Sequence, residues 1–153
     1  MSLERVIEIA EGENGYKPEK YDSKYSEYFF PGERPMGWCI PFIEWVFVNV
    51  YGEKEAKRKL HLDAFTQSVN AFANYFKQAK KWSWKQAGKG WVIFIRSKNA
   101  YMDHAGLVVY ADPDIVTSIE GNVNGEVKGV TRKRDDYHIA GYGKVEYEEG
   151  ETL

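Results

Sequence analysis

The sequence has only one cysteine, Cys39, among its 153 residues. A single thiol excludes an intrachain disulfide and any zinc site built from several thiolates. The chain also has no apolar run long enough for a transmembrane helix, and it does not open with a basic and then apolar signal segment. No excess of charge of either sign is present, because 21 Lys and Arg face 23 Asp and Glu. We therefore expect no nucleic acid and no membrane surface as a partner.

What the sequence does have is hydrophobic residues (43%) and an unusual share of aromatic residues (16%). A chain of this length and composition predicts a single domain, residues 1–153, with a substantial core. Aromatic side chains bury more area than others, so core packing explains most of them. The alternative use of some of these rings is a groove that grips a sugar or a peptide.

Helical patterns occupy the first half of the chain. Residues 3–11 and 67–79 have apolar side chains at helical spacing. Residues 39–51 are almost wholly apolar, with Pro41 in the first turn and Gly52 just past the end, which predicts a central helix. The segment between the first two helices predicts a loop with a short helix near Ser26.

The second half of the chain has short apolar runs bounded by Gly, Asn, Asp or Pro. These runs predict strands of a meandering antiparallel sheet, at residues 91–96, 105–110, 115–119, 127–131 and 139–147. Helices followed by strands are typical of the α+β class. We expect the helices of the N-terminal half to pack on the C-terminal antiparallel sheet.

Cys39 is the first candidate for chemistry, although a lone cysteine is usually an inert buried side chain. It stands at the predicted start of the central helix, where free backbone N–H groups and the helix dipole favour an anion. A thiol in that position loses its proton more readily than a free one, which favours a nucleophilic role. Gly37 would allow a tight turn that leaves the sulfur open.

A thiolate nucleophile needs a base that can return a proton to a leaving amine, and imidazole suits that role. Of the three histidines, His61 lies in a charged stretch that indicates a solvated face. His138 precedes the last strand, where a structural role is expected. His104 opens the strand at 105–110, beside a turn, so we choose it as the base. Gly106 would leave room there for another backbone or a substrate.

A third member of the site would come from Glu120 or Asn122 at the end of the next strand. A hairpin around Asp112 brings these residues back opposite His104. They share a face with His104 only if the loop has an odd length or a bulge interrupts a strand. In that case either residue can accept a hydrogen bond from the imidazole and fix its tautomer. The alternative is that residues 120–122 are only a turn.

Several segments together resemble the CHAP family, the cysteine, histidine-dependent amidohydrolases/peptidases that cut bacterial peptidoglycan. WCIPFIEW (38–45) is similar to the family motif W-C-x-x-F-[VI]-x-W, and GWVIF (90–94) is similar to G-D-[IVL]-[IV]-F. HAGLV (104–108) is similar to H-[VTA]-G-[IL]-V, and TSIEGN (117–122) is similar to T-I-E-G-N. Residues 14–16 and 139–143 resemble the ends of lysin-type members from phages and prophages. Trp91 stands where the family has Asp, and Ile40 and Pro41 replace small residues.

This resemblance implies Cys39 as nucleophile, His104 as base and acid, Glu120 as orienting residue and Asn122 as a helper. It also implies a papain-like α+β fold. The reaction would be cleavage of an amide bond of the cell wall, by an N-acetylmuramoyl-L-alanine amidase or by a stem or cross-bridge endopeptidase. That chemistry needs no metal and no cofactor.

The resemblance leaves two further interpretations of function open. One is a non-catalytic wall-binding or structural relative with a vestigial cysteine. The other is a cysteine amidase or protease with a substrate outside the wall. On the leading interpretation the partner is peptidoglycan, and the protein is made in the cytoplasm and reaches the wall by another route than a signal peptide.

Overall fold

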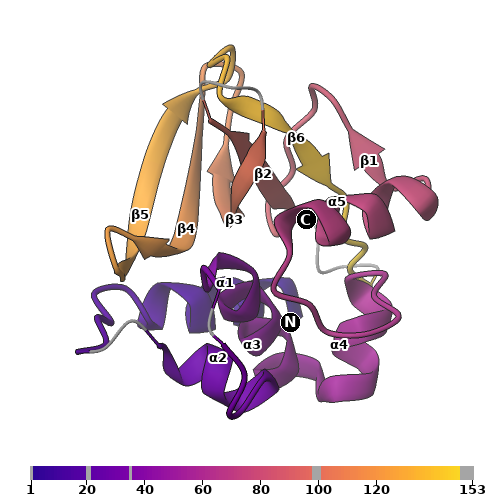
Figure 1. Ribbon diagram of the computed structural model, residues 1–153. Coiled ribbons are helices and arrows are strands. Elements are labelled where there is room, and N and C mark those ends of the chain that lie inside the picture. The colour runs from indigo at the N-terminus through magenta and orange to yellow at the C-terminus, as the bar shows by residue number, and fades with distance from the viewer. Residues whose placement is uncertain (1, 20–21, 35, 98–100, 149–153) are drawn as a thin grey trace.

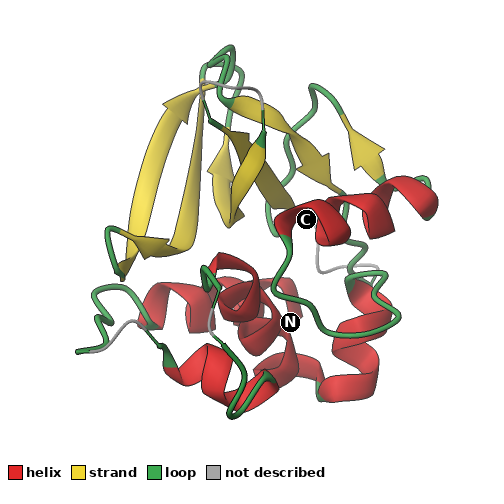
Figure 2. Ribbon diagram, in the orientation of Figure 1, coloured by secondary structure: helices red, strands yellow, loops and turns green. Residues whose placement is uncertain are grey.

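The computed structural model describes residues 2–19, 22–34, 36–97 and 101–148, with helices in the first half and strands in the second (Figures 1 and 2). The helices are α1 (Ser2–Gly12), α2 (Lys24–Phe29), α3 (Cys39–Tyr51), α4 (Glu53–Lys59) and α5 (Val69–Gln78). The strands are β1 (Trp82–Ser83), β2 (Val92–Arg96), β3 (Met102–Ala111), β4 (Ile115–Val123), β5 (Glu126–Lys133) and β6 (Ile139–Gly143). The α+β prediction is confirmed.

Helix α3 is the centre of the helical layer. It begins at Cys39 and ends at Tyr51, followed by Gly52 with a φ of 80°. Pro41 fits because the first turn of a helix has no internal partners for its N–H groups. Most of its residues are buried because α1, α2 and α4 contact it and β3 and β4 cover its remaining side.

The sheet is antiparallel at every pair, in the order β1-β6-β2-β3-β4-β5. Strands β2 to β5 form the expected meander, but the expectation that the last strand continues it was wrong. Strand β6 pairs with β2 and β1 instead. Every residue of β6 is buried, which suits a strand with neighbours on both sides rather than an edge strand.

The two faces of the sheet belong to two separate clusters of buried side chains. Alternate strand residues contact the helices, among them Val92, Phe94, Ala105, Leu107 and Ile119. The opposite face carries a smaller cluster of Ile93, Ile95, Val108, Val116, Ile139 and Tyr142. Because β6 starts beside β2, the connection from β5 at residues 134–138 has to pass strands β4, β3 and β2.

Two elements were not predicted, α4 and β1. Helix α4 carries mostly charged residues and is only seven residues long, so it has no clear apolar stripe. Strand β1 is two residues long. The short helix near Ser26 is present as α2, where the side chain of Ser23 accepts a hydrogen bond from the Ser26 N–H. No described helix combines the length and the apolar character that a membrane span requires.

Candidate active site

Cys39 is the first residue of α3 and is buried, with 4% of its surface exposed. It lines a cavity of about 230 Å³ together with residues 36–37, 67–70 and 102–103. The 67–70 wall is tied to the rest of the site, since Gln67 accepts a hydrogen bond from the Met36 N–H at 3.1 Å. Residues of three segments thus line a small, open cavity at Cys39.

Glu44, five residues further along α3, binds the chain just before residues 67–70 from the interior of the protein. Its carboxyl is fully buried, and one oxygen accepts a hydrogen bond from the Thr66 N–H at 2.8 Å. The other oxygen has no hydrogen-bond partner among the described residues. Burial raises the pKa of Glu44 well above its ordinary value, so the carboxyl is held in its neutral form.

His104 lies near the start of β3 and interacts with both Cys39 and Glu120. Its Nε2 is 2.8 Å from Oε1 of Glu120, and its ring is within hydrogen-bonding reach of the Cys39 thiol. Burial alone would lower the pKa of His104, but the hydrogen bonds with Cys39 and Glu120 outweigh it and raise the pKa to about 10. The imidazole is therefore protonated at neutral pH.

Glu120 is a buried carboxylate with three partners. Besides His104, it accepts hydrogen bonds from the Ser118 hydroxyl at 2.5 Å and from both terminal nitrogens of the Arg132 guanidinium. Burial would raise the pKa of Glu120, but the bonds with His104 and Arg132 prevail and lower it to about 2. A charged carboxylate so held fixes the imidazole ring and stabilises its positive charge.

The strand register explains why His104 and Glu120 meet. Leu107 pairs with Ile119 and Val108 with Ser118, but beyond them Tyr110 pairs with Thr117, so a bulge lies at Val109. The bulge that the prediction required is therefore present, and it places Glu120 on the same face as His104.

The space above Gly106 holds the side chain of Glu120. A Cβ added to Gly106 would lie 2.5 Å from Cγ of Glu120. The room that we expected for a substrate or a backbone is therefore filled by the side chain of Glu120. Glycine at this position lets Glu120 pass across β3 to reach His104.

The side chain of Asn122 lies beside Gly37, two residues before Cys39. It has a positive φ of 64° within a register shift between Glu120 and Val123. A Cβ added to Gly37 would be 3.5 Å from the side-chain nitrogen of Asn122. The backbone beside it is packed tightly on α3, since a Cβ on Gly121 would be 2.7 Å from Phe42. Asn122 thus flanks the segment that leads into Cys39.

The other two histidines lie outside this group. His138 is exposed and its ring Nδ1 is 2.9 Å from Asp136, in keeping with the structural role that we expected. His61 is not on a solvated face, because its ring packs edge-on against Phe76 and its Nε2 is buried. Burial and the nearby Lys81 lower the pKa of His61. The error arose because α4, which ends just before it, was not predicted.

Sequence reasoning missed Arg132 and Ser118, which hold Glu120. The Asn124-Gly125 pair does mark a two-residue hairpin turn, and both residues have positive φ. Counting from that turn alone would pair Glu120 with Gly129, but a register shift between Glu120 and Val123 pairs it with Lys128 instead. Since side chains alternate along a strand, this shift places Arg132 on the face of Glu120, and the turn by itself could not have shown it.

The chemical capacity of this group is nucleophilic catalysis, with a thiol, an imidazole and a carboxylate in one connected series. Among the residues that the structure describes, no three His, Cys, Asp or Glu side chains are grouped to hold a metal ion. A scan against models of known protein families finds no match, and a search of curated proteins finds no significant match either. The likeness to the CHAP family therefore stays a prediction.

Proposed function

We propose that this protein is a cysteine amidohydrolase or peptidase that hydrolyses an amide bond of bacterial peptidoglycan. The observation that carries the proposal is the series Cys39, His104 and Glu120, with the cysteine at the start of a helix. The four short motifs that resemble the CHAP family support peptidoglycan as the substrate.

In the first half of the reaction the Cys39 proton resides on His104, and the Cys39 sulfur attacks the carbonyl carbon of the amide. The resulting oxyanion is stabilised by the Cys39 backbone N–H, since N–H groups in the first turn of a helix have no partner within it. His104 then donates its proton to the amide nitrogen. The C–N bond breaks, the amine leaves, and the acyl group remains on sulfur as a thioester.

In the second half His104, now neutral, takes a proton from water while the water oxygen attacks the thioester carbon. The C–S bond breaks, the carboxylic acid leaves, and Cys39 and His104 return to their starting state. Glu120 keeps the imidazole oriented and favours its charged form throughout. Arg132 keeps Glu120 ionised and in place.

The test is digestion of purified cell walls, with mass spectrometry of the released fragments. A new amine and a new carboxyl at one amide bond would support the proposal, and the fragment masses name the bond. Release of fragments from protein substrates but not from walls would favour a cysteine protease with another substrate. Binding to walls without release, combined with no alkylation of Cys39 by iodoacetamide, would favour a non-catalytic binder.

A further inference from the structure

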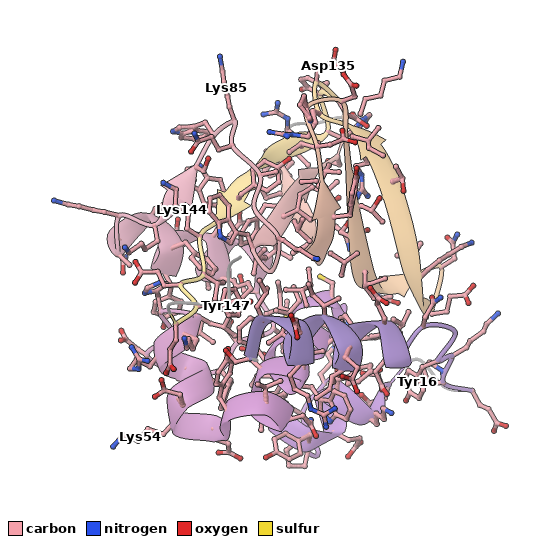
Figure 3. All side chains as sticks on the ribbon, turned by 180° about the vertical axis from the view of Figure 1, so that it is seen from behind. Tyr16, Lys54, Lys85, Asp135, Lys144 and Tyr147 are labelled. Carbon is pink, nitrogen blue, oxygen red and sulfur yellow. The ribbon has the colours of Figure 1, made fainter. Side chains whose placement is uncertain are left out.

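A second and larger cavity lies apart from Cys39, beside the smaller cluster of the sheet. It has a volume of about 500 Å³, which is in the range of small-molecule sites. Its lining comes from the segment after β1, the end of β2, the 134–137 connection and β6. Lys85 and Asp135, which belong to this lining, both lie at the end of the molecule remote from the helical layer (Figure 3).

Two buried polar groups in the lining of this cavity are unsatisfied. Among the described residues, no group accepts a hydrogen bond from the Tyr142 hydroxyl or from Nε of Arg134, although the Arg134 side chain lies close enough to the hydroxyl to oppose the rise in its pKa that burial causes. The guanidinium is held in place because its other nitrogens donate to the Asp112 carbonyl at 2.7 Å and to the Lys85 carbonyl at 2.9 Å. Buried donors are nearly always paired, so a ligand oxygen that accepts from them would complete the site.

Aromatic rings form another part of the lining. Trp84 and Tyr137 are 69% and 56% exposed. Each ring is braced: Trp84 packs edge-on against Trp82, and the Arg96 guanidinium lies 4.4 Å from the centre of the Tyr137 ring. Braced and exposed rings present flat apolar faces at little entropic cost.

The charges of the lining nearly cancel. Lys85, Arg96 and Arg134 are cationic, and Asp135 and Asp136 are anionic. Asp136 is already engaged, since it accepts hydrogen bonds from the His138 N–H and ring. This balance does not suit a polyanion or a strongly cationic peptide. It suits a neutral or singly charged ligand with many hydroxyl groups and an apolar face.

We propose that this cavity binds a sugar unit of the glycan strand, with the ring against Trp84 and Tyr137 and an oxygen on Tyr142 and Arg134. The inference rests on the proposed function, because the glycan strand belongs to the same wall polymer whose peptide Cys39 would cut.

The experiment is a titration of the Cys39→Ser protein with chitotetraose, a soluble analogue of the glycan backbone, followed by backbone amide NMR shifts. We expect saturable shifts in the cavity lining. Trp84→Ala and Tyr137→Ala should each raise Kd at least about tenfold, equivalent to about 1.4 kcal/mol. Tyr28→Ala is the matched control, since Tyr28 is 48% exposed but lies on α2, and it should leave Kd unchanged.

Tyr142→Phe distinguishes a hydroxyl that binds the ligand from one that only stabilises the fold. Because no described residue accepts a hydrogen bond from the Tyr142 hydroxyl, its removal should weaken chitotetraose binding severalfold without lowering the melting temperature. The proposal is overturned if chitotetraose gives no saturable shifts up to about 10 mM, or if Trp84→Ala and Tyr137→Ala bind it as the parent does. Either result leaves the hydrolase proposal standing, because wall cleavage by Cys39 is measured separately. Conversely, binding by a protein that cuts no wall would contradict only the proposed function.

Discussion

Replacing Glu120 by Gln should lower the pKa of His104 while leaving the shape of the site almost unchanged. The carboxylate is buried and 2.8 Å from the imidazole Nε2. Two unit charges about 4 Å apart interact by about 4 kcal/mol at an effective dielectric constant of about 20. One pKa unit corresponds to about 1.4 kcal/mol, so the pKa of His104 should fall from about 10 to about 7. The positive charge of Arg132, left without its carboxylate, acts in the same direction.

The assay is NMR titration of the histidine ring Cε1–H signals, in which His61 and His138 serve as internal controls. Ser118→Ala is the control variant, because it removes one hydrogen bond to Glu120 but keeps the charge. It should change the pKa of His104 by less than about one unit. If the pKa of His104 in Glu120→Gln changes as little as in Ser118→Ala, the electrostatic role that we give to the carboxylate is refuted.

The same variant should alter the pH dependence of hydrolysis. A lower His104 pKa means that the imidazole loses its proton at lower pH, so the basic limb of the pH–rate profile should move down with it. Glu120→Gln should cost more activity than Asn122→Ala, whose side chain flanks Gly37. The reverse ranking would make Asn122 the orienting residue and Glu120 a structural carboxylate.

Three further predictions concern packing and pH. Gly106→Ala should abolish wall hydrolysis, because its Cβ would displace the side chain of Glu120. Gly129→Ala should keep activity, because its Cβ would meet Ile119 at an ordinary 3.6 Å. Equal activity of the two variants would contradict this prediction. Glu44→Gln should raise the melting temperature at pH 7. Burial raises the pKa of Glu44, so the stability associated with its neutral form is present below the unfolded pKa and is lost as pH rises; an unchanged or lower melting temperature would contradict it. Stability of the parent should fall as pH drops from about 4.5 to about 2, because the pKa of Glu120 is lowered in the folded protein. It should also fall as pH rises from about 6.5 to about 10, because the pKa of His104 is raised in the folded protein. If thermal melts of Glu120→Gln show the same loss of stability at acid pH as the parent, Glu120 is not its cause.

The sequence alone predicts an element correctly where residues such as Pro and Gly mark its ends. The central helix was predicted from Cys39 to Tyr51, as observed, because Pro41 and Gly52 act through the conformation of their own backbone. The pairing of the last strand, β6, was not predicted correctly. Its apolar residues show that it is buried, but its position between β1 and β2 depends on contacts with segments far away in the chain.

The candidate site shows the same division. Cys39 and His104 were chosen from residue type and from place within an element, whereas Glu120 was chosen from the hairpin register and the resemblance to the CHAP family. The bulge at Val109, which puts Glu120 on the face of His104, has no sequence mark that we used. Arg132 went unnoticed because its role arises only from pairing across two strands.

The central claim is that the Cys39 sulfur is the nucleophile, and substitution of that one atom tests it most directly. Initial rates of fragment release from purified walls should be measured for the parent and for Cys39→Ser, with His138→Ala as a control outside the site. We predict no release by Cys39→Ser at an unchanged melting temperature, because serine lacks the acidity of a thiol, and a normal rate for His138→Ala. Release by Cys39→Ser at a rate near that of the parent would contradict the account.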